Sequence, residues 1–225
     1  MPKVIDLSQS LGPGTANIPG HPPIEYRLIH THEKHFRTNA VITFSVHVGT
    51  HVDPPYHFIP DGPTIDEVPL DRLMGPAHVF RVANRCRGRG HAPITVDDLL
   101  ADGPLPKDGL RGKIVLINSG WAEDAYNKPN YYTEGPYLAV ETAEWLVEQG
   151  VHAVGLENPP DDYRPGIRSR GDGPVHVALL SKGICIIENL CNMESLKLRD
   201  VWVSALPIKI QRGCGGTARV VAVED

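Results

Sequence analysis

Four residues that commonly bind metal ions or transfer protons lie within one short stretch of this sequence: His47, His51, Asp53 and His57. Imidazole nitrogens together with a carboxylate suit zinc, manganese or iron. Because side chains alternate between the two faces of a strand, His47, His51 and Asp53 would point the same way, with Gly49 leaving room between them. On a helix, Asp53 would lie about 200° around from His51. The spacing therefore predicts a metal platform on a strand.

The residues around these ligands favour a strand as well. Val48 and Val52 are β-branched, and the Pro54-Pro55 pair would end the element. The plain alternative is an edge strand whose polar face points at water, which is the usual explanation of a lone His-x-x-x-His. We favour metal binding because four features coincide here: a carboxylate, a spacing that puts the ligands on one strand face, a glycine between them and a further histidine.

Two residues far along the chain are candidates for the other half of such a site. His176 lies in an apolar run typical of a helix, where a histidine taken alone is more often a core residue. Glu188 directly follows an apolar strand, and a buried carboxylate is costly unless it is paired or binds a cation. A helix, a turn at Gly183 and a strand between them would allow the two side chains to converge.

The elements that must position these residues follow from hydrophobic periodicity and turn signals. We expect strands at 4–7, 24–29, 40–46 (continuing into the metal-binding stretch), 77–82, 113–118, 151–156, 184–187, 202–210 and 218–223, and helices at 96–101, 138–149 and 174–181. The 113–118 run is continuously apolar, which predicts a strand buried on both faces. The sum is a strand-rich, mixed α/β protein with residues 1–225 in a single domain.

Composition excludes several classes of function. The chain has 225 residues, 41% of them hydrophobic, and a formal net charge of −5. There is no basic footprint for nucleic acid and no apolar run long enough to span a bilayer. The start lacks the pattern of a signal peptide, and the four cysteines form no Cys-x-x-Cys pair. We therefore expect a cytoplasmic protein with reduced thiols and no nucleic-acid or membrane partner.

The run His47-x-Gly-Thr-His51-x-Asp53-x-Pro-x-His57-Phe resembles the signature of the cyclase family of metal-dependent hydrolases, which includes bacterial kynurenine formamidases and isatin hydrolases. The resemblance covers nearly the whole chain. It includes Ile5-Asp6-Leu7-Ser8 at the start, the segment from His176 to Leu190, and Ala205-Leu206-Pro207-Ile208-Lys209 near the end.

The resemblance implies a fold, a cofactor and an assembly. The fold would be a swivelling β/β/α domain, the cofactor one or two divalent ions, Zn or Mn, and the assembly a homodimer or homotetramer. His47, His51 and Asp53 would bind metal, with Asp53 able to bridge two ions. His176 and Glu188 would complete the shell of a second ion or polarise water. His57 would act as general acid and base, or as an outer ligand.

The expected activity is hydrolysis of a small amide, either a formamide like N-formylkynurenine or a lactam like isatin. Two departures from the family pattern bear on the substrate: Pro160 stands where a hydroxyl is usual, and Gly215-Gly216-Thr217 stands where Gly-x-Pro is usual. Candidate substrate-binding residues are two aromatic and two basic side chains: Phe44, Trp121, Arg164 and Arg168.

Each of these four has a plainer explanation. The aromatic residues suit an ordinary core, and the stretch from Arg164 to Arg170 suits a solvated loop. Arg164 or Arg168 would otherwise bind a substrate carboxylate bidentately. Two further functions remain open: a metal-dependent lyase or dehydratase acting next to a carbonyl, and a metal-binding or ligand-binding protein without activity.

Overall fold

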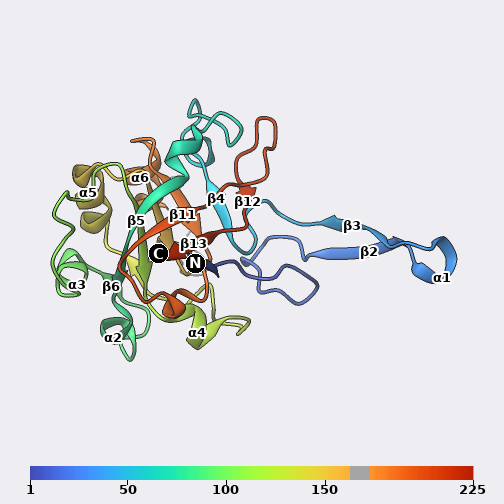
Figure 1. Cartoon of the computed structure of the whole chain (residues 1–225), viewed down its shortest axis with the longest axis horizontal. Helices are drawn as coiled ribbons and strands as arrows, with labels where there is room; N and C mark the ends of the chain where they lie inside the picture. The colour runs from blue at the N-terminus through green and yellow to red at the C-terminus, as the bar shows by residue number, and fades with distance from the viewer. Residues whose placement is uncertain (163–172, 225) are drawn as a thin grey trace.

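A mixed sheet of nine strands forms the body of the computed structural model, which describes residues 1–162 and 173–224 (Figure 1). The strand order is β1-β13-β11-β5-β7-β9-β10-β4-β12. These strands are β1 (Lys3–Asp6), β4 (His51–Asp53), β5 (Met74–Arg81), β7 (Ile114–Asn118), β9 (Ala153–Leu156), β10 (Cys185–Glu188), β11 (Asp200–Ser204), β12 (Gly216–Thr217) and β13 (Val221–Glu224).

The centre of the sheet is parallel and the flanks are antiparallel. Strands β5, β7, β9 and β10 run parallel to one another, whereas β4 pairs antiparallel with β10. Every residue of β7, β9 and β10 is buried. Buried parallel strands read as continuous apolar runs, so the prediction of a fully buried strand at 113–118 is confirmed.

The sheet curls, so that its two faces bury different cores. An isolated antiparallel bridge joins Ser8, just beyond β1, to Leu190, just beyond β10. The inner core contains Ile5, Val52, Val79 and Leu116 from strands across the whole sheet. The outer core packs central strands against three helices, α3 (Val96–Leu100), α5 (Val140–Gln149) and α6 (Pro174–Leu180). The strand-rich, mixed α/β class is confirmed.

Local sequence signals fix two of these helices. Thr95 and Asp98 form a capping box at the start of α3, each side chain bonded to the other's backbone N–H. Gly150 ends α5 with φ 71°, a left-handed conformation that costs glycine little. The remaining elements are short: α2 (Ala83–Cys86), α4 (Trp121–Ala125), β6 (Pro93–Ile94), β8 (Tyr137–Leu138), and 3₁₀ turns η1 (Pro55–His57), η2 (Leu70–Arg72) and η3 (Met193–Ser195).

The long strand predicted from residue 40 into the metal-binding stretch is wrong. Strand β3 (Asn39–Thr43) ends before it, residues 44–50 form turns, and β4 contains only His51–Asp53. Gly49 has φ +58°, a value that turns the chain out of an extended path. The strand expected at 202–210 likewise ends early, at Ser204.

A hairpin projects away from the body (Figure 1). It consists of β2 (Glu25–His30) paired antiparallel with β3, joined by the single turn of α1 (His32–His35). Its strands contain almost no buried residue, although several are large and apolar. Within the described part of the chain, no helix is long and apolar enough to cross a membrane.

Candidate metal centre

Register between β4 and β10 brings two of the predicted ligands together. His51 pairs with Glu188 across these antiparallel strands. Directly paired residues point to the same face of a sheet. His51 Nε2 accordingly lies 3.7 Å from Glu188 Oε2. Asp53, two residues further along β4, points to the same side, with Oδ1 3.3 Å from His51 Nε2. The same-face prediction is therefore met for His51 and Asp53.

The His51 ring is held by its other nitrogen. His51 Nδ1 lies 2.8 Å from the Gly49 carbonyl oxygen, which also accepts from the Asn189 amide at 3.0 Å. A carbonyl can only accept, so Nδ1 carries a proton and Nε2 is the nitrogen turned toward the two carboxylates. Metal-binding histidines typically use this arrangement, with the outer nitrogen hydrogen-bonded and the inner one facing the ion.

His47 reaches the same place by a turn rather than by strand parity. Its Nδ1 lies 2.7 Å from Asp53 Oδ1, although the two residues do not share a strand. The positive φ of Gly49 folds the chain back, so that the imidazole approaches Asp53 from the side. The predicted proximity of His47 to Asp53 is confirmed, but its predicted cause, a shared strand face, is wrong.

His176 enters from the first turn of α6, on the far side of Asp53. Its Nε2 lies 3.1 Å from Glu188 Oε1 and 3.6 Å from Asp53 Oδ2. Its Nδ1 lies 2.5 Å from Asp161 Oδ2, which repeats the pattern of an outer acceptor and an inner free nitrogen. Asp161 was not among the predicted site residues. Asp161 lies well before Pro174, where the helix that carries His176 begins, and it opens a charged stretch whose sequence suggests a solvated loop, so no local signal connects it to His176.

Asp53 lies at the centre of the cluster and is fully buried. Among the described residues its Oδ2 has no hydrogen-bond partner, and buried carboxylate oxygens rarely lack one. Two sets of potential ligand atoms lie within 4.8 Å of one another, and both include Asp53: His47, Asp53 and His57 in one, His51, Asp53 and Glu188 in the other. A cation would supply the missing partner, so these residues fit a divalent ion, and the shared carboxylate fits a bridge between two.

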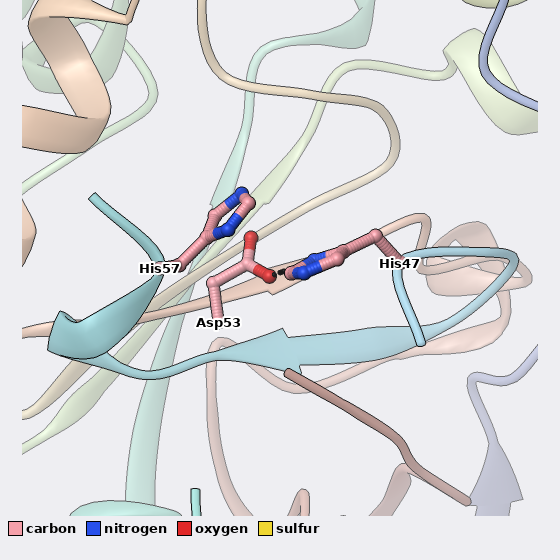
Figure 2. Close-up of side chains that lie close together, drawn as sticks. All are labelled: His47, Asp53 and His57. Carbon is pink, nitrogen blue, oxygen red and sulfur yellow. Dashed lines mark hydrogen bonds and ion pairs between the residues drawn. The ribbon is translucent and has the colours of Figure 1, made fainter. Parts of the chain in front are cut away.

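His57 stands over this cluster on the 3₁₀ turn η1, directly after β4 (Figure 2). Its ring stacks on His47, with centroids 3.9 Å apart. The next residue, Phe58, stacks on His176 with centroids 4.4 Å apart. Pro54 and Pro55 restrict the backbone before the turn and hold the imidazole at a fixed offset from Asp53.

Electrostatics separate the roles of the histidines. Burial lowers the pKa of His57 to about 3, so its imidazole is neutral near pH 7. Burial opposes protonation of His51 too, but the Asp53 carboxylate outweighs it and raises the pKa of His51 to about 9. His176 behaves in the same way: burial lowers its pKa, but Asp161, Asp53 and Glu188 together outweigh burial and hold the pKa well above the usual range. In the metal-free protein, the additional proton on His51 and on His176 thus occupies a position that a cation would take.

Asp53 shows the complementary shift. Burial disfavours its charge, yet the nearby His51, His176 and His47 rings together hold the pKa of this carboxyl well below its usual range. Asp53 therefore keeps its negative charge despite being buried, which favours binding of a positive ion.

The predicted substrate residues are placed less closely. Phe44 is half-buried where the projecting hairpin meets the turn that carries His47. Trp121 donates to the Tyr131 carbonyl at 2.9 Å and lines a cavity of about 350 Å³ whose described lining includes no member of the metal cluster. Arg164 and Arg168 lie outside the described residues.

Pro160 and Thr217, which depart from the family pattern, each contact a strand of the structure. The Pro160 carbonyl accepts a hydrogen bond from the Leu138 N–H at 2.8 Å. Thr217 pairs with His51 through β12, and its hydroxyl oxygen is buried without a hydrogen-bond partner in the described structure.

Comparison with known proteins agrees with this geometry. A family model described as "Putative cyclase" matches residues 5–163. A kynurenine formamidase from Bacillus cytotoxicus is 27% identical over 96% of this chain and 95% of its own length. The structure of isatin hydrolase A from Ralstonia solanacearum superposes with a TM-score of 0.85 at 24% identity, covering 100% of this chain and 92% of that one. A structure from Bacillus stearothermophilus described as a predicted metal-dependent hydrolase gives 0.76 at 24% identity, with 100% of both chains covered.

Proposed function

This chain belongs to the cyclase family, and we propose that it is a metal-dependent hydrolase that cleaves the carbon–nitrogen bond of a small amide. The observation that carries the proposal is the buried Asp53 carboxylate. Three histidines and Glu188 surround it, yet its Oδ2 lacks a hydrogen-bond partner in the part of the chain that the structure describes. Such a centre has the composition of an open catalytic site rather than of a closed, cysteine-rich structural one.

Five residues would hold the metal: His47, His51 and Asp53 on one side, and Asp53, His176 and Glu188 on the other. Their mixed nitrogen and oxygen donors suit zinc or manganese, and the shared Asp53 suits one or two ions. When bound, a divalent ion lowers the pKa of water toward neutrality and polarises a carbonyl group. The remaining chemistry belongs to the side chains around it.

His57 would be the general acid and base. Its imidazole is neutral and stands over the cluster, where it can take a proton from the attacking water. It can then return that proton to the leaving nitrogen, which must be protonated for the amide bond to break. Glu188, fixed between His51 and His176, would orient the water through a carboxylate oxygen.

The substrate class is inferred from the relatives. A kynurenine formamidase and an isatin hydrolase, which resemble this chain over nearly its full length, are named for a formamide and a lactam. Both substrates present an amide carbonyl beside an aromatic ring. We infer a small aryl formamide or a lactam. Phe58, which stacks on His176, and Phe44 are candidate ring contacts, and Trp121, Arg164 and Arg168 are further candidates.

We also propose that the protein is a cytoplasmic homodimer or homotetramer assembled through the projecting hairpin. Tyr26 and Leu28, two residues apart on β2, point to the same face of the hairpin, and Ile42 pairs directly with Tyr26. These three side chains are 53%, 48% and 42% exposed. A two-stranded hairpin is only marginally stable in water, and a contiguous apolar face normally marks an interaction site. The four cysteines are all free, as expected in a reducing compartment.

Metal analysis of the purified protein followed by turnover assays tests the activity. We expect zinc or manganese to co-purify and to support hydrolysis of N-formylkynurenine, isatin or a simple formanilide. Chelation should abolish turnover and re-addition of the ion should restore it. Bound metal without hydrolysis of any amide would contradict the proposal and favour lyase chemistry or a binding role.

A further inference from the structure

The loop before β12 packs against the metal cluster from the side of His47. β12 pairs with β4, with Gly216 opposite Val52 and Thr217 opposite His51. The Gly213 carbonyl accepts from the Ile65 N–H at 2.9 Å, which fixes the other end of the loop. Cys214 and Gly215 lie between these two anchors. Their backbone is therefore held in place, and what they contact is set by the fold.

Both residues meet the His47 imidazole. Cys214 Sγ lies 3.5 Å from His47 Nε2, the nitrogen on the opposite side of the ring from Asp53. At Gly215 the approach is so close that an added Cβ would lie 2.6 Å from His47 Cε1. The ring is thus held by Asp53 at Nδ1, by the thiol at Nε2, by His57 stacked on its face, and by the bare Gly215 backbone.

We propose that Cys214 is a positioning residue for His47. This inference rests on the proposed function, because its purpose is to orient a ligand of the metal. A histidine that offers Nδ1 to a cation carries its proton on Nε2, where the Cys214 sulfur would accept it. Without the ion, Nδ1 carries the proton and donates to Asp53, and the Cys214 thiol can donate to Nε2 instead, so the same contact holds the ring in both states. Cys214 thereby keeps Nδ1 turned toward Asp53. His51 and His176 are held in the same way, by the Gly49 carbonyl and by Asp161.

Cys214 does not fit the role of a metal ligand. The two sets of atoms close enough to share an ion both include Asp53, and neither includes the thiol. The sulfur instead contacts the nitrogen that faces away from Asp53. A thiolate bound directly to the ion would also make the centre resemble a structural zinc site, whereas a thiol behind His47 leaves the open face of the cluster unchanged.

The test compares Cys214→Ala and Cys214→Ser with Cys191→Ala as a matched control. Cys191 is also half-buried, but its electrostatic neighbours are Asp6, Glu123 and Glu157 rather than the metal cluster. The first readout is the nitrogen NMR spectrum of the histidine rings in the metal-free protein. The second is zinc affinity, measured by competition with a chelating dye.

We expect Cys214→Ala to shift or broaden the His47 ring signals and to weaken zinc binding by about 10- to 100-fold. Cys214→Ser should recover most of both, since a hydroxyl can donate to Nε2 in the metal-free protein and accept its N–H when Nδ1 binds the ion. Gly215→Ala, which keeps the thiol but pushes on the ring, should also displace the His47 signals. Cys191→Ala should change neither readout.

Unchanged His47 signals in Cys214→Ala would overturn the inference, and so would an equal loss of zinc affinity in Cys191→Ala. A wild-type protein that binds neither zinc nor manganese would instead overturn the proposed function. The ring spectra of the metal-free protein would still decide the role of Cys214 in that case, so the two failures are distinguishable.

Discussion

Asp161 Oδ2 lies 2.5 Å from His176 Nδ1, and the same carboxylate accepts the backbone N–H groups of Val175 at 2.8 Å and of His176 at 3.2 Å. One buried side chain therefore fixes both the start of α6 and the orientation of the imidazole that α6 carries. Because Nδ1 is occupied, Nε2 must face Glu188 and Asp53. Asp161 thus acts on the cluster without contacting the position of the ion.

Replacing Asp161 with asparagine should weaken the centre through this contact. In Asp161→Asn, the amide oxygen can still accept from the backbone, but a single neutral acceptor cannot hold both the helix start and the ring. We expect a loss of about 10- to 100-fold in metal affinity or kcat/KM, measured by chelator competition and initial rates.

The matched control is the neighbouring Asp162→Asn. Asp162 pairs with His91 at 2.5 Å, outside the metal cluster. This variant should keep metal affinity and turnover close to those of the wild type. Similar losses in both variants would show that the loop as a whole, rather than the Asp161–His176 contact, supports the centre.

Features with a strictly local cause could be predicted from the sequence. The apolar runs predicted the central strands, and periodicity with turn signals predicted helices at 96–101 and 138–149. The structure has these as α3, which begins at the Thr95 capping box, and α5, which ends at Gly150. Strand parity correctly placed His51 beside Asp53, because both lie on the short strand β4. In each of these cases the residues that decide the structure are adjacent in the chain.

Features that depend on contacts between distant parts of the chain could not be predicted from the sequence. The turn at Gly49 carries His47 to Asp53, and nothing in the surrounding valines signals it. Asp161 and Cys214 touch His176 and His47 only because α6 and the loop before β12 fold onto β4 and β10. The exposed hairpin has the same alternation as a buried strand, since the pattern shows an apolar face but not what covers it.

Two histidine variants should separate metal binding from proton transfer. His57→Ala removes a neutral imidazole that stands over the cluster, so we expect turnover to fall by about 100- to 10,000-fold while metal content is retained. His51→Ala removes an inner ligand atom, so it should lose both metal and turnover. Elemental analysis and initial rates on the same preparations provide the measurement. Equal loss of metal from both variants would rule out this division of roles and make His57 a ligand.

Glu157 should make stability depend on pH. Burial raises the pKa of this carboxyl from 4.5 to about 8, and nearby Glu123 adds to the shift. A carboxyl whose pKa is higher in the folded chain binds its proton more tightly there. Its stabilising contribution is therefore complete below pH 4.5 and is lost as pH rises to about 8. The contribution of Glu157 to the free energy of unfolding should fall by roughly 1 kcal/mol per pH unit inside this window. The lowered pKa of His57 contributes the opposite slope below its ordinary value of 6.5, so the Glu157 contribution is read as a difference between variants.

Urea unfolding of the metal-free protein at several pH values between 5 and 8 measures this slope. Glu157→Gln has no proton to lose, and its amide oxygen can still accept from Ser119 and Trp121, so its slope should be more positive than that of the wild type by the Glu157 contribution. Glu144→Gln, on the exposed side of α5, is the control and should keep the wild-type slope. A wild-type slope in Glu157→Gln would show that another group governs the pH dependence.

The projecting hairpin provides the last prediction, because its two faces differ. Leu28 and Ile42 lie on the face that also carries Tyr26, whereas Val41 pairs with Arg27 on the opposite face. All three candidate sites for substitution are similarly exposed, at 48%, 42% and 44% for Leu28, Ile42 and Val41. Lysine at any of them should therefore cost the isolated chain little, and differences between the variants should report on assembly.

If the apolar face packs against another copy of the chain, the double variant Leu28→Lys with Ile42→Lys should dissociate the protein into monomers in analytical ultracentrifugation. The reason is that two buried charges without partners would oppose association by several kcal/mol. Val41→Lys introduces the same residue on the opposite face and should leave the oligomer intact. A wild-type protein that sediments as a monomer, or a Val41→Lys variant that dissociates as completely as the double variant, would contradict assembly through this face.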